Sequence, residues 1–354
     1  MTRDAGFSLV EVIVATALTM SLAGVVVSLA TPGTTASPVL PEAIDLQQRA
    51  RVAADVLAED LSKAGAGLSA GPELGPLVDF FAPVVPRRMG MTQPDAFTVA
   101  RPDAITIRYV PDSHAQTTVS AFAFAPSVVA TLIQSPGCPA QSSCGFSAGA
   151  DVFVFDRLGQ AETFSIQQVQ SGIAVLQPHD ATGFPFQPGA SIAEAMSRTY
   201  YFDSAQRQLR VYDGSQTDAP VVDGVVGMSF SYFGDPNPPL APRPSLGSAN
   251  CLYDASGALD PSLVTLPGSG GALEPLPLSM LTDGPWCGTG AARFDADLLR
   301  VREIRVSLRL EAQASFRAAG PAFAHPGTAT AAPRALPDVQ LSFDVTPRNM
   351  NLRR

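Results

Sequence analysis

The apolar positions at the start of the chain form one uninterrupted run. Twenty consecutive residues from Val12 to Thr31 carry no charge, and the run reaches twenty-five residues when it is extended back to Phe7. At 1.5 Å per residue, a helix over residues 7–31 spans roughly 37 Å, which is enough to cross a bilayer. Its one ionisable side chain is Glu11, and no later segment is comparably long and apolar. We therefore predict one transmembrane helix, with the rest of the chain on one side of the membrane.

The helical period is interrupted and then returns. Residues 32–41 contain Pro32, Gly33, Pro38 and Pro41, which predict a broken linker. Over residues 42–66, leucines and alanines recur three and four positions apart, which predicts an amphipathic helix that ends at glycine. Its expected buried positions are Leu46, Ala50, Ala53, Leu57, Leu61 and Ala64. Its expected polar positions, on other faces, are Gln47, Arg51, Asp55, Glu59 and Asp60.

The remainder of the chain has the pattern of short strands. Alternating runs bounded by Gly, Pro or Asp fill residues 97–233, and two further strand patterns lie at 298–312 and 338–346. Between them, residues 235–292 hold ten Pro and eight Gly, which predicts an insertion of mostly irregular chain, either a long loop or a partner-binding lobe. The pattern predicts an α+β fold: an amphipathic helix packed on an antiparallel sheet, with a head over 67–234 and 293–354.

Composition narrows the possible functions. A chain that is 46% hydrophobic and 16% charged is not disordered as a whole, and a net charge of -9 gives no general attraction for nucleic acid. Three His and four Cys offer little material for metal or redox chemistry, and there is no glycine-rich phosphate loop. We expect no cofactor and no metal, and the composition points away from an enzyme.

A carboxylate at position 11 costs free energy in lipid, so it implies a partner. The tract Gly6-Phe7-Ser8-Leu9-Val10-Glu11-Val12 resembles the class III signal of type IV prepilins and type II secretion pseudopilins. The resemblance implies that residues 1–6 are a leader, that a membrane peptidase cuts after Gly6, and that it methylates the new N-terminal Phe7. The α-amino cation of Phe7 then needs an anion, which Glu11 of a neighbouring subunit would supply.

Weaker similarities follow in the rest of the chain. The helix over residues 47–65, the strands at 198–213 and 221–232, and the ending 345–350 resemble PilW-type minor pilins. The resemblance implies a minor subunit of a type IV pilus, held in the bacterial inner membrane by a single pass with its head in the periplasm. Its partners would be the prepilin peptidase and other pilins. A J-type minor pseudopilin of a type II secretion system is the alternative, and the sequence does not separate the two.

An alternative of another class is an exported hydrolase. The apolar run could be a Sec signal peptide that is cleaved before Thr31, and residues 145–149 match the G-x-S-x-G motif with Ser147 as nucleophile. That motif needs a strand before it and a helix after it, whereas a strand is predicted to follow here. His179 and His325 each stand alone in Pro-rich surroundings, and we expect His114 at the surface. We interpret the motif as a chance match.

The four cysteines are an even number, which in an exported domain predicts disulfides. They are Cys138, Cys144, Cys251 and Cys287, and their spacings do not fit a zinc site. We predict Cys138–Cys144 and Cys251–Cys287, although three connectivities are possible.

Overall fold

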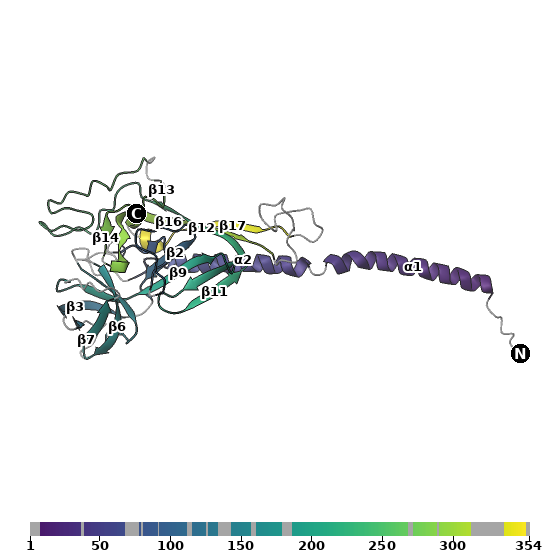
Figure 1. Ribbon diagram of the computed structural model, residues 1–354, viewed down its shortest axis with the longest axis horizontal. Coiled ribbons are helices and arrows are strands. Elements are labelled where there is room, and N and C mark those ends of the chain that lie inside the picture. The colour runs from purple at the N-terminus through teal and green to yellow at the C-terminus, as the bar shows by residue number, and fades with distance from the viewer. Residues whose placement is uncertain are drawn as a thin grey trace. The chain divides into compact units, whose positions relative to one another are not determined.

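The computed structural model describes residues 8–36, 39–67, 78, 81–90, 92–111, 115–124, 127–133, 143–156, 161–178, 186–267, 272–288, 290–312 and 336–351 (Figure 1). The chain divides into two compact units. The first comprises residues 1–50 with 310–339, and the second comprises 51–309 with 340–354.

Helix α1 (Leu9–Ala36) contains a single charged residue, Glu11, in its first turn. The segment Leu9–Val27 is long and apolar enough to cross a membrane, a test that a signal sequence also passes, and none of it is buried. The helix continues past Pro32 and Gly33 to Ala36, and α2 (Val39–Ser62) follows, so most of the expected linker is helical. Pro32 removes one helical hydrogen bond without ending the helix.

Helix α2 has the buried stripe that the spacing of its leucines and alanines predicted. All six expected positions are less than 5% exposed, from Leu46 to Ala64. Gly65, in the left-handed region at φ +69°, lies in the turn that ends the helix. One polar position was assigned wrongly: Asp60 is 3% exposed and lies on the buried side of the helix with Leu57 and Leu61.

The second unit contains two open antiparallel sheets. The five-stranded sheet has the order β1 (Val84–Val85), β2 (Ala104–Tyr109), β9 (Met196–Asp203), β10 (Gln208–Tyr212), β11 (Asp218–Asp223). The four-stranded sheet has the order β13 (Glu274–Leu276), β12 (Val225–Gly234), β16 (Val301–Leu310), β17 (Val339–Val345).

A closed barrel of six antiparallel strands lies in the same unit (Figure 1). Its order is β3 (Gln116–Ala123), β4 (Val128–Leu132), β7 (Ile173–Pro178), β6 (Ala161–Gln170), β5 (Asp151–Phe155), β8 (Ser191–Glu194). Inward-facing side chains such as Val119, Phe164 and Ile192 fill it. All six strands lie in sequence between β2 and β9, which pair with each other in a register that places Tyr109 opposite Met196.

The expected α+β, helix-on-sheet head is therefore wrong. The described residues contain far more strand than helix, with only two α-helices among them and a closed barrel that the expectation did not contain. The alternation of apolar residues identified strands at the right places, but it does not encode which strands pair. Pairings between distant segments, such as β3 with β8, decide that a barrel closes.

The insertion 235–292 consists mainly of turns in its described part. Its short strands are β13, which pairs with β12, and β14 (Trp286–Cys287), which pairs with β15 (Phe294–Asp295). The 3-10 helix η3 (Ala296–Arg300) follows. Arg300 is 1% exposed and donates from Nη2 to the backbone oxygen of Val264 at 2.7 Å, which fixes the insertion to η3.

Candidate functional site

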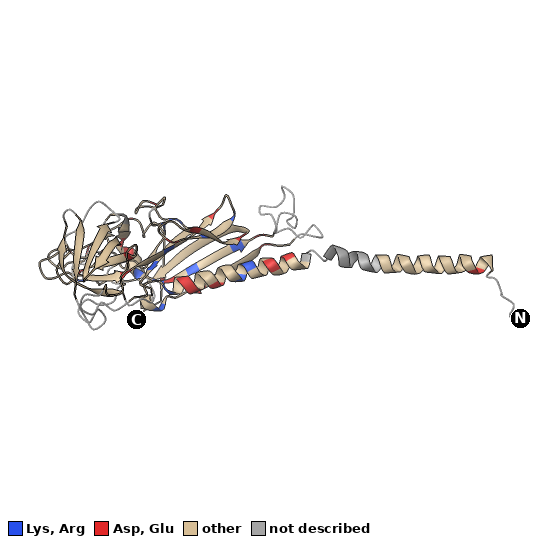
Figure 2. Ribbon diagram, turned by 90° about the horizontal axis from the view of Figure 1, so that it is seen from below, with Lys and Arg blue, Asp and Glu red and all other residues tan. Residues whose placement is uncertain are grey.

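The candidate site of assembly is the start of α1. Gly6 and Phe7 lie outside the described residues, whereas Glu11 lies in the first turn of the helix and is exposed. Figure 2 shows one acidic position near the start of α1 and no other charge along its described part. A carboxylate near a helix N-terminus interacts favourably with the helix dipole. The structure therefore presents Glu11 on an apolar, exposed helix.

In the part of α1 whose side chains the structure describes, residues 9–27, the hydroxyl groups are satisfied within the helix itself. Thr16 Oγ1 donates to the backbone oxygen of Val12 at 2.8 Å, and Ser21 Oγ donates to that of Ala17 at 2.8 Å. Thr19 Oγ1 likewise donates to the oxygen of Ala15. Polar groups that are already paired can enter lipid at low cost. The helix is therefore compatible with a membrane despite its hydroxyl side chains, and Glu11 is its one costly group.

No protein-family model, curated protein or solved structure matches this chain. The similarity to prepilins accordingly depends on the N-terminal residues themselves.

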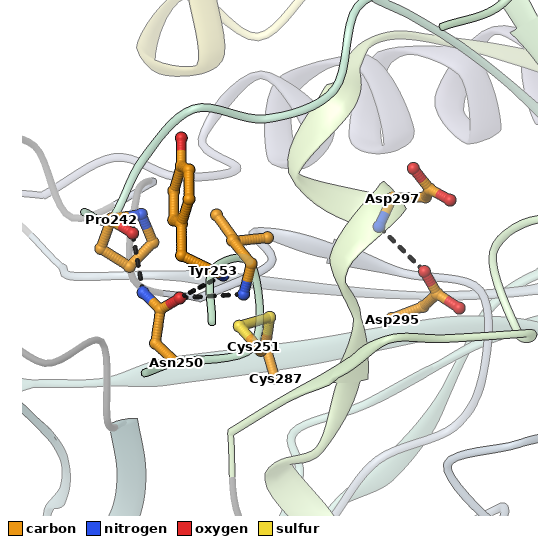
Figure 3. The surroundings of a disulfide bond; sticks show 8 residues. Pro242, Asn250, Cys251, Tyr253, Cys287, Asp295 and Asp297 are labelled. Atoms are coloured by element: carbon orange, nitrogen blue, oxygen red, sulfur yellow. Dashed lines mark hydrogen bonds between the residues drawn. A yellow bond between two sulfur atoms is a disulfide. The ribbon is translucent and has the colours of Figure 1, made fainter. Parts of the chain in front are cut away.

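The predicted disulfide between Cys251 and Cys287 is present, with the two Cα atoms 5.0 Å apart (Figure 3). Beside it, the side-chain oxygen of Asn250 accepts from the backbone N–H groups of Leu252 and Tyr253 at 2.9 Å each. These contacts hold the bend that presents Cys251 to strand β14. Cys144 is also disulfide-bonded, and its predicted partner, Cys138, lies outside the described residues.

One group of carboxylates could offer oxygen ligands to a hard cation such as Ca²⁺. Asp283, Asp295 and Asp297 each have an oxygen within 4.8 Å of the others. The structure also gives the two buried members protein partners: Asp295 accepts from the backbone N–H groups of Asp297 and Gly284 and caps η3. Asp297 Oδ1 lies 2.8 Å from Arg300 Nε. We interpret the group as an anchor of the insertion, one that the sequence signalled only through the Asp295-x-Asp297 spacing.

Burial controls the ionisation of this group. Desolvation, only partly offset by the backbone hydrogen bonds, raises the pKa of Asp295 to about 6. Desolvation also raises the pKa of Asp297 to about 7, although the charge of Arg300 opposes the shift. These two carboxyls therefore titrate near neutrality rather than at the ordinary value for Asp.

A second charged network, centred on the buried Asp60, joins α2 to β9. Asp60 Oδ2 accepts from Arg198 Nη1 at 2.6 Å and from the hydroxyl of Tyr200, and Asp60 Oδ1 accepts from Lys63 Nζ at 2.8 Å. Burial alone would raise the pKa of Asp60, but these hydrogen bonds hold it below its ordinary value. The signal that could have found Asp60 is its spacing, three residues after Leu57 and four before Ala64.

The G-x-S-x-G match does not have the structure of a nucleophile elbow. Residues 143–150 form turns, and strand β5 follows where that motif requires a helix. Ser147 is exposed in this turn, while Phe146 next to it is 3% exposed and packs in the barrel core. The three histidines, His114, His179 and His325, lie outside the described residues.

Proposed function

We propose that this chain is a membrane-anchored subunit of a type IV pilus that is cleaved after Gly6 and methylated at Phe7. The observation that carries the proposal is the single carboxylate of Glu11, in the first turn of an otherwise uncharged 28-residue helix. Glu11 lies four residues after Phe7, which would be the N-terminal residue of the cleaved protein. For a simple anchor, the interaction of this charge with the helix dipole is set against the free-energy cost of a carboxylate in lipid. A subunit that must align with its neighbours gains a partner for the charge as well.

The mechanism of assembly follows from charge pairing in a medium of low dielectric. Cleavage leaves the α-amino cation of Phe7 at the start of the helix, and Glu11 of an adjacent subunit supplies the anion. Because a buried charge without its partner is costly, the pair favours one axial register between two helices. The apolar residues that follow, as far as Val27, can then pass from lipid into a bundle of helices without moving another charge.

The proposed location is the bacterial inner membrane, with the residues after α1 in the periplasm. A disulfide between Cys251 and Cys287 supports this side, because disulfides persist in oxidising compartments. The N-terminal signal of type II secretion pseudopilins is the same, so the alternative within this proposal is that the chain is a J-type minor pseudopilin of a type II secretion system.

N-terminal sequencing of the protein from membranes tests the proposal. We expect the wild type to begin at Phe7, and Gly6→Leu to keep Met1 because the bulky side chain blocks the peptidase. Ala5→Leu, one residue earlier, is the matched control and should still be cleaved. A mature chain that begins at Thr31 would overturn the proposal in favour of a secreted protein, and an unprocessed wild type would leave only a plain anchor.

A further inference from the structure

Strand β17 is an open edge of the four-stranded sheet. It is hydrogen-bonded to β16 on one side, and within the described residues no strand pairs with its other side. Neighbouring side-chain pairs show that β16 and β17 are antiparallel; they are Arg305 with Asp344 and Ser307 with Ser342. The outward backbone N–H and C=O groups of an edge strand are unpaired, so they form a template for one more strand. The structure that would cover this edge is therefore an extended strand.

The other three edges of the two open sheets are protected against such pairing. Strand β1 has two residues, and β13 has three residues with Pro275 at its centre. Strand β11 contains the exposed Pro220, a bulge in its pairing with β10 and an Asp at each end. Short length, proline, bulges and charge are the means by which proteins prevent pairing at an edge. Strand β17 has seven residues, no proline and a single charge, that of Asp344, so it lacks most of this protection.

The side chains of β17 alternate between two kinds. The odd-numbered positions from 339 to 343 are apolar and half-buried, whereas the even-numbered positions from 340 to 344 are polar and exposed. A strand added at this edge would continue both faces of the sheet, so it needs the same alternation. The edge therefore fits an amphipathic strand.

The sequence of β17, V-Q-L-S-F-D-V, reads nearly the same in both directions when its residues are grouped by type. If two copies of the strand pair antiparallel about Ser342, the opposed positions are 339 with 345, 340 with 344, 341 with 343, and 342 with itself. Leu341 then faces Phe343, Gln340 faces Asp344, and the two terminal valines face each other. A parallel pair in register would instead place Asp344 beside Asp344, which is unfavourable. The strand is therefore complementary to its own antiparallel copy.

The charges at this edge are compatible with the same pairing. Arg305 Nε donates to Asp344 Oδ1 at 2.7 Å, and the antiparallel ladder places Arg309 of β16 beside Gln340 of β17. The second copy's Asp344 would lie on the other side of Gln340, so that the row across the joined sheets has an acidic group between two arginines. The chain as a whole carries a charge of -9, which opposes association, but β16 and β17 together contain three Arg and two acidic residues. The general repulsion between two copies is therefore not repeated at this edge.

We propose that two copies of this chain pair through β17, antiparallel about Ser342, and join their four-stranded sheets into one continuous sheet. The contact is isologous, since each strand presents the same residues to the other. Backbone hydrogen bonds supply the affinity, and the alternating side chains fix the register. A strand of another protein could satisfy the same backbone groups, but the match of β17 with itself favours a second copy. This inference concerns the sheet edge alone and does not depend on the proposed function.

A disulfide trap tests the register. Directly opposed residues of an antiparallel pair have Cα atoms roughly 4.5–5.5 Å apart, a distance that a disulfide can bridge. Under mild oxidation of the full chain in a neutral detergent, Ser342→Cys should therefore give a covalent dimer on non-reducing gels. Gln340→Cys is the matched control on the same strand, because its two copies would lie about 13 Å apart along the strands. It should cross-link at least tenfold more slowly, and equal rates for the two variants would overturn the proposal.

Sedimentation velocity in the same detergent, over a range of protein concentrations, tests the association itself. We expect a reversible dimer for the wild type. Ser342→Lys would place two ammonium groups opposite each other and should raise the dimer dissociation constant at least tenfold. Ser231→Lys is the matched control, because Ser231 is exposed on β12, an interior strand of the same sheet. Near-UV circular dichroism of both variants should stay that of the wild type, and the disulfide trap decides the matter if it does not.

Three results would overturn the proposal. The first is a wild type that stays monomeric up to about 100 µM, far above the Kd of specific complexes. The second is a dimer that Ser342→Lys leaves unchanged while its circular dichroism is that of the wild type, because such a dimer would form elsewhere. The third is a monomeric wild type whose β17 edge binds a strand of another protein, which would assign the edge to that partner.

Discussion

Replacing Asp60 with Asn tests whether a buried carboxylate fixes α2 to the five-stranded sheet. Asp60 is 3% exposed and accepts hydrogen bonds from Lys63, Arg198 and Tyr200. Asn has the same shape, but its NH₂ group is itself a hydrogen-bond donor and cannot accept from the donors that surround Asp60. The variant therefore removes the negative charge and one acceptor without creating a cavity.

The expected loss can be estimated contact by contact. Tyr200 is 1% exposed, and leaving its hydroxyl without an acceptor costs about 1–3 kcal/mol. The side chains of Arg198 and Lys63 are 37% and 38% exposed, so water screens their ion pairs, and each contributes about 0–1 kcal/mol. We expect Asp60→Asn to lower the free energy of unfolding by about 1–5 kcal/mol.

The assay is urea unfolding of the full chain in detergent, followed by near-UV circular dichroism. Asp55→Asn is the matched control, since Asp55 lies on the same helix and is exposed, and it should change stability by less than about 0.5 kcal/mol. The effect should also depend on pH. Because the folded pKa of Asp60 lies below its ordinary value of 3.8, its contribution is complete above that value and is lost as the pH falls below it.

Two results would refute this reasoning. If Asp60→Asn destabilises the protein no more than Asp55→Asn, the network does not hold α2. If the difference between Asp60→Asn and the wild type persists unchanged at the lowest pH at which both fold, the charge of Asp60 is not its cause.

Four further outcomes are expected. Glu11→Val should leave membrane insertion and cleavage intact but reduce the amount of the protein in sheared pili, as measured by immunoblot; equal recovery with wild type would contradict the register model. Replacing Cys251 and Cys287 together with Ser should cost about 3–4 kcal/mol in non-reducing urea unfolding, and adding reductant to the wild type should reproduce the loss. The Arg108 guanidinium lies 4.3 Å from the Phe153 ring centroid, and Arg108→Ala should destabilise the protein more than Arg108→Met, whose side chain fills most of the same space. The reverse order of stability in thermal unfolding would refute a packing role for Arg108. Because burial raises the pKa of Asp297 from 3.8 to about 7, the folded state holds this proton over a range where the unfolded state has lost it. The wild-type free energy of unfolding should therefore fall as the pH rises from about 4 to about 7, and Asp297→Asn should show a flatter profile.

The features that the sequence predicted correctly are those set by local periodicity. The uncharged run around Val12 to Val27 is helix, and the three- and four-residue spacing identified the buried stripe of α2 from Leu46 to Ala64. Strands occur where apolar and polar residues alternate, as in residues 104–109 and 301–310. The pairing of Cys251 with Cys287 was also predicted.

The features that it missed depend on contacts between distant segments. Nothing local to Gln116 or Ala193 indicates that they pair, yet β3 with β8 closes the barrel and changes the fold class. Asp60 was assigned to a polar face because its charge outweighed its position, and its partners Arg198 and Tyr200 lie well over a hundred residues away. A buried ionic group such as that of Asp60 can be identified only when the fold brings its distant partners together.

The position of the barrel in the chain has a consequence for the order of folding. Strands β2 and β9 can pair only after residues 110–195 have been closed into a loop, and closure entropy disfavours so long a loop. The first and last strands of the barrel, β3 and β8, pair with each other and thereby bring the two ends of this loop together. Once the barrel has formed, joining Tyr109 to Met196 is in effect a short-range event. We expect the barrel to fold first and to act as the nucleus on which the five-stranded sheet assembles.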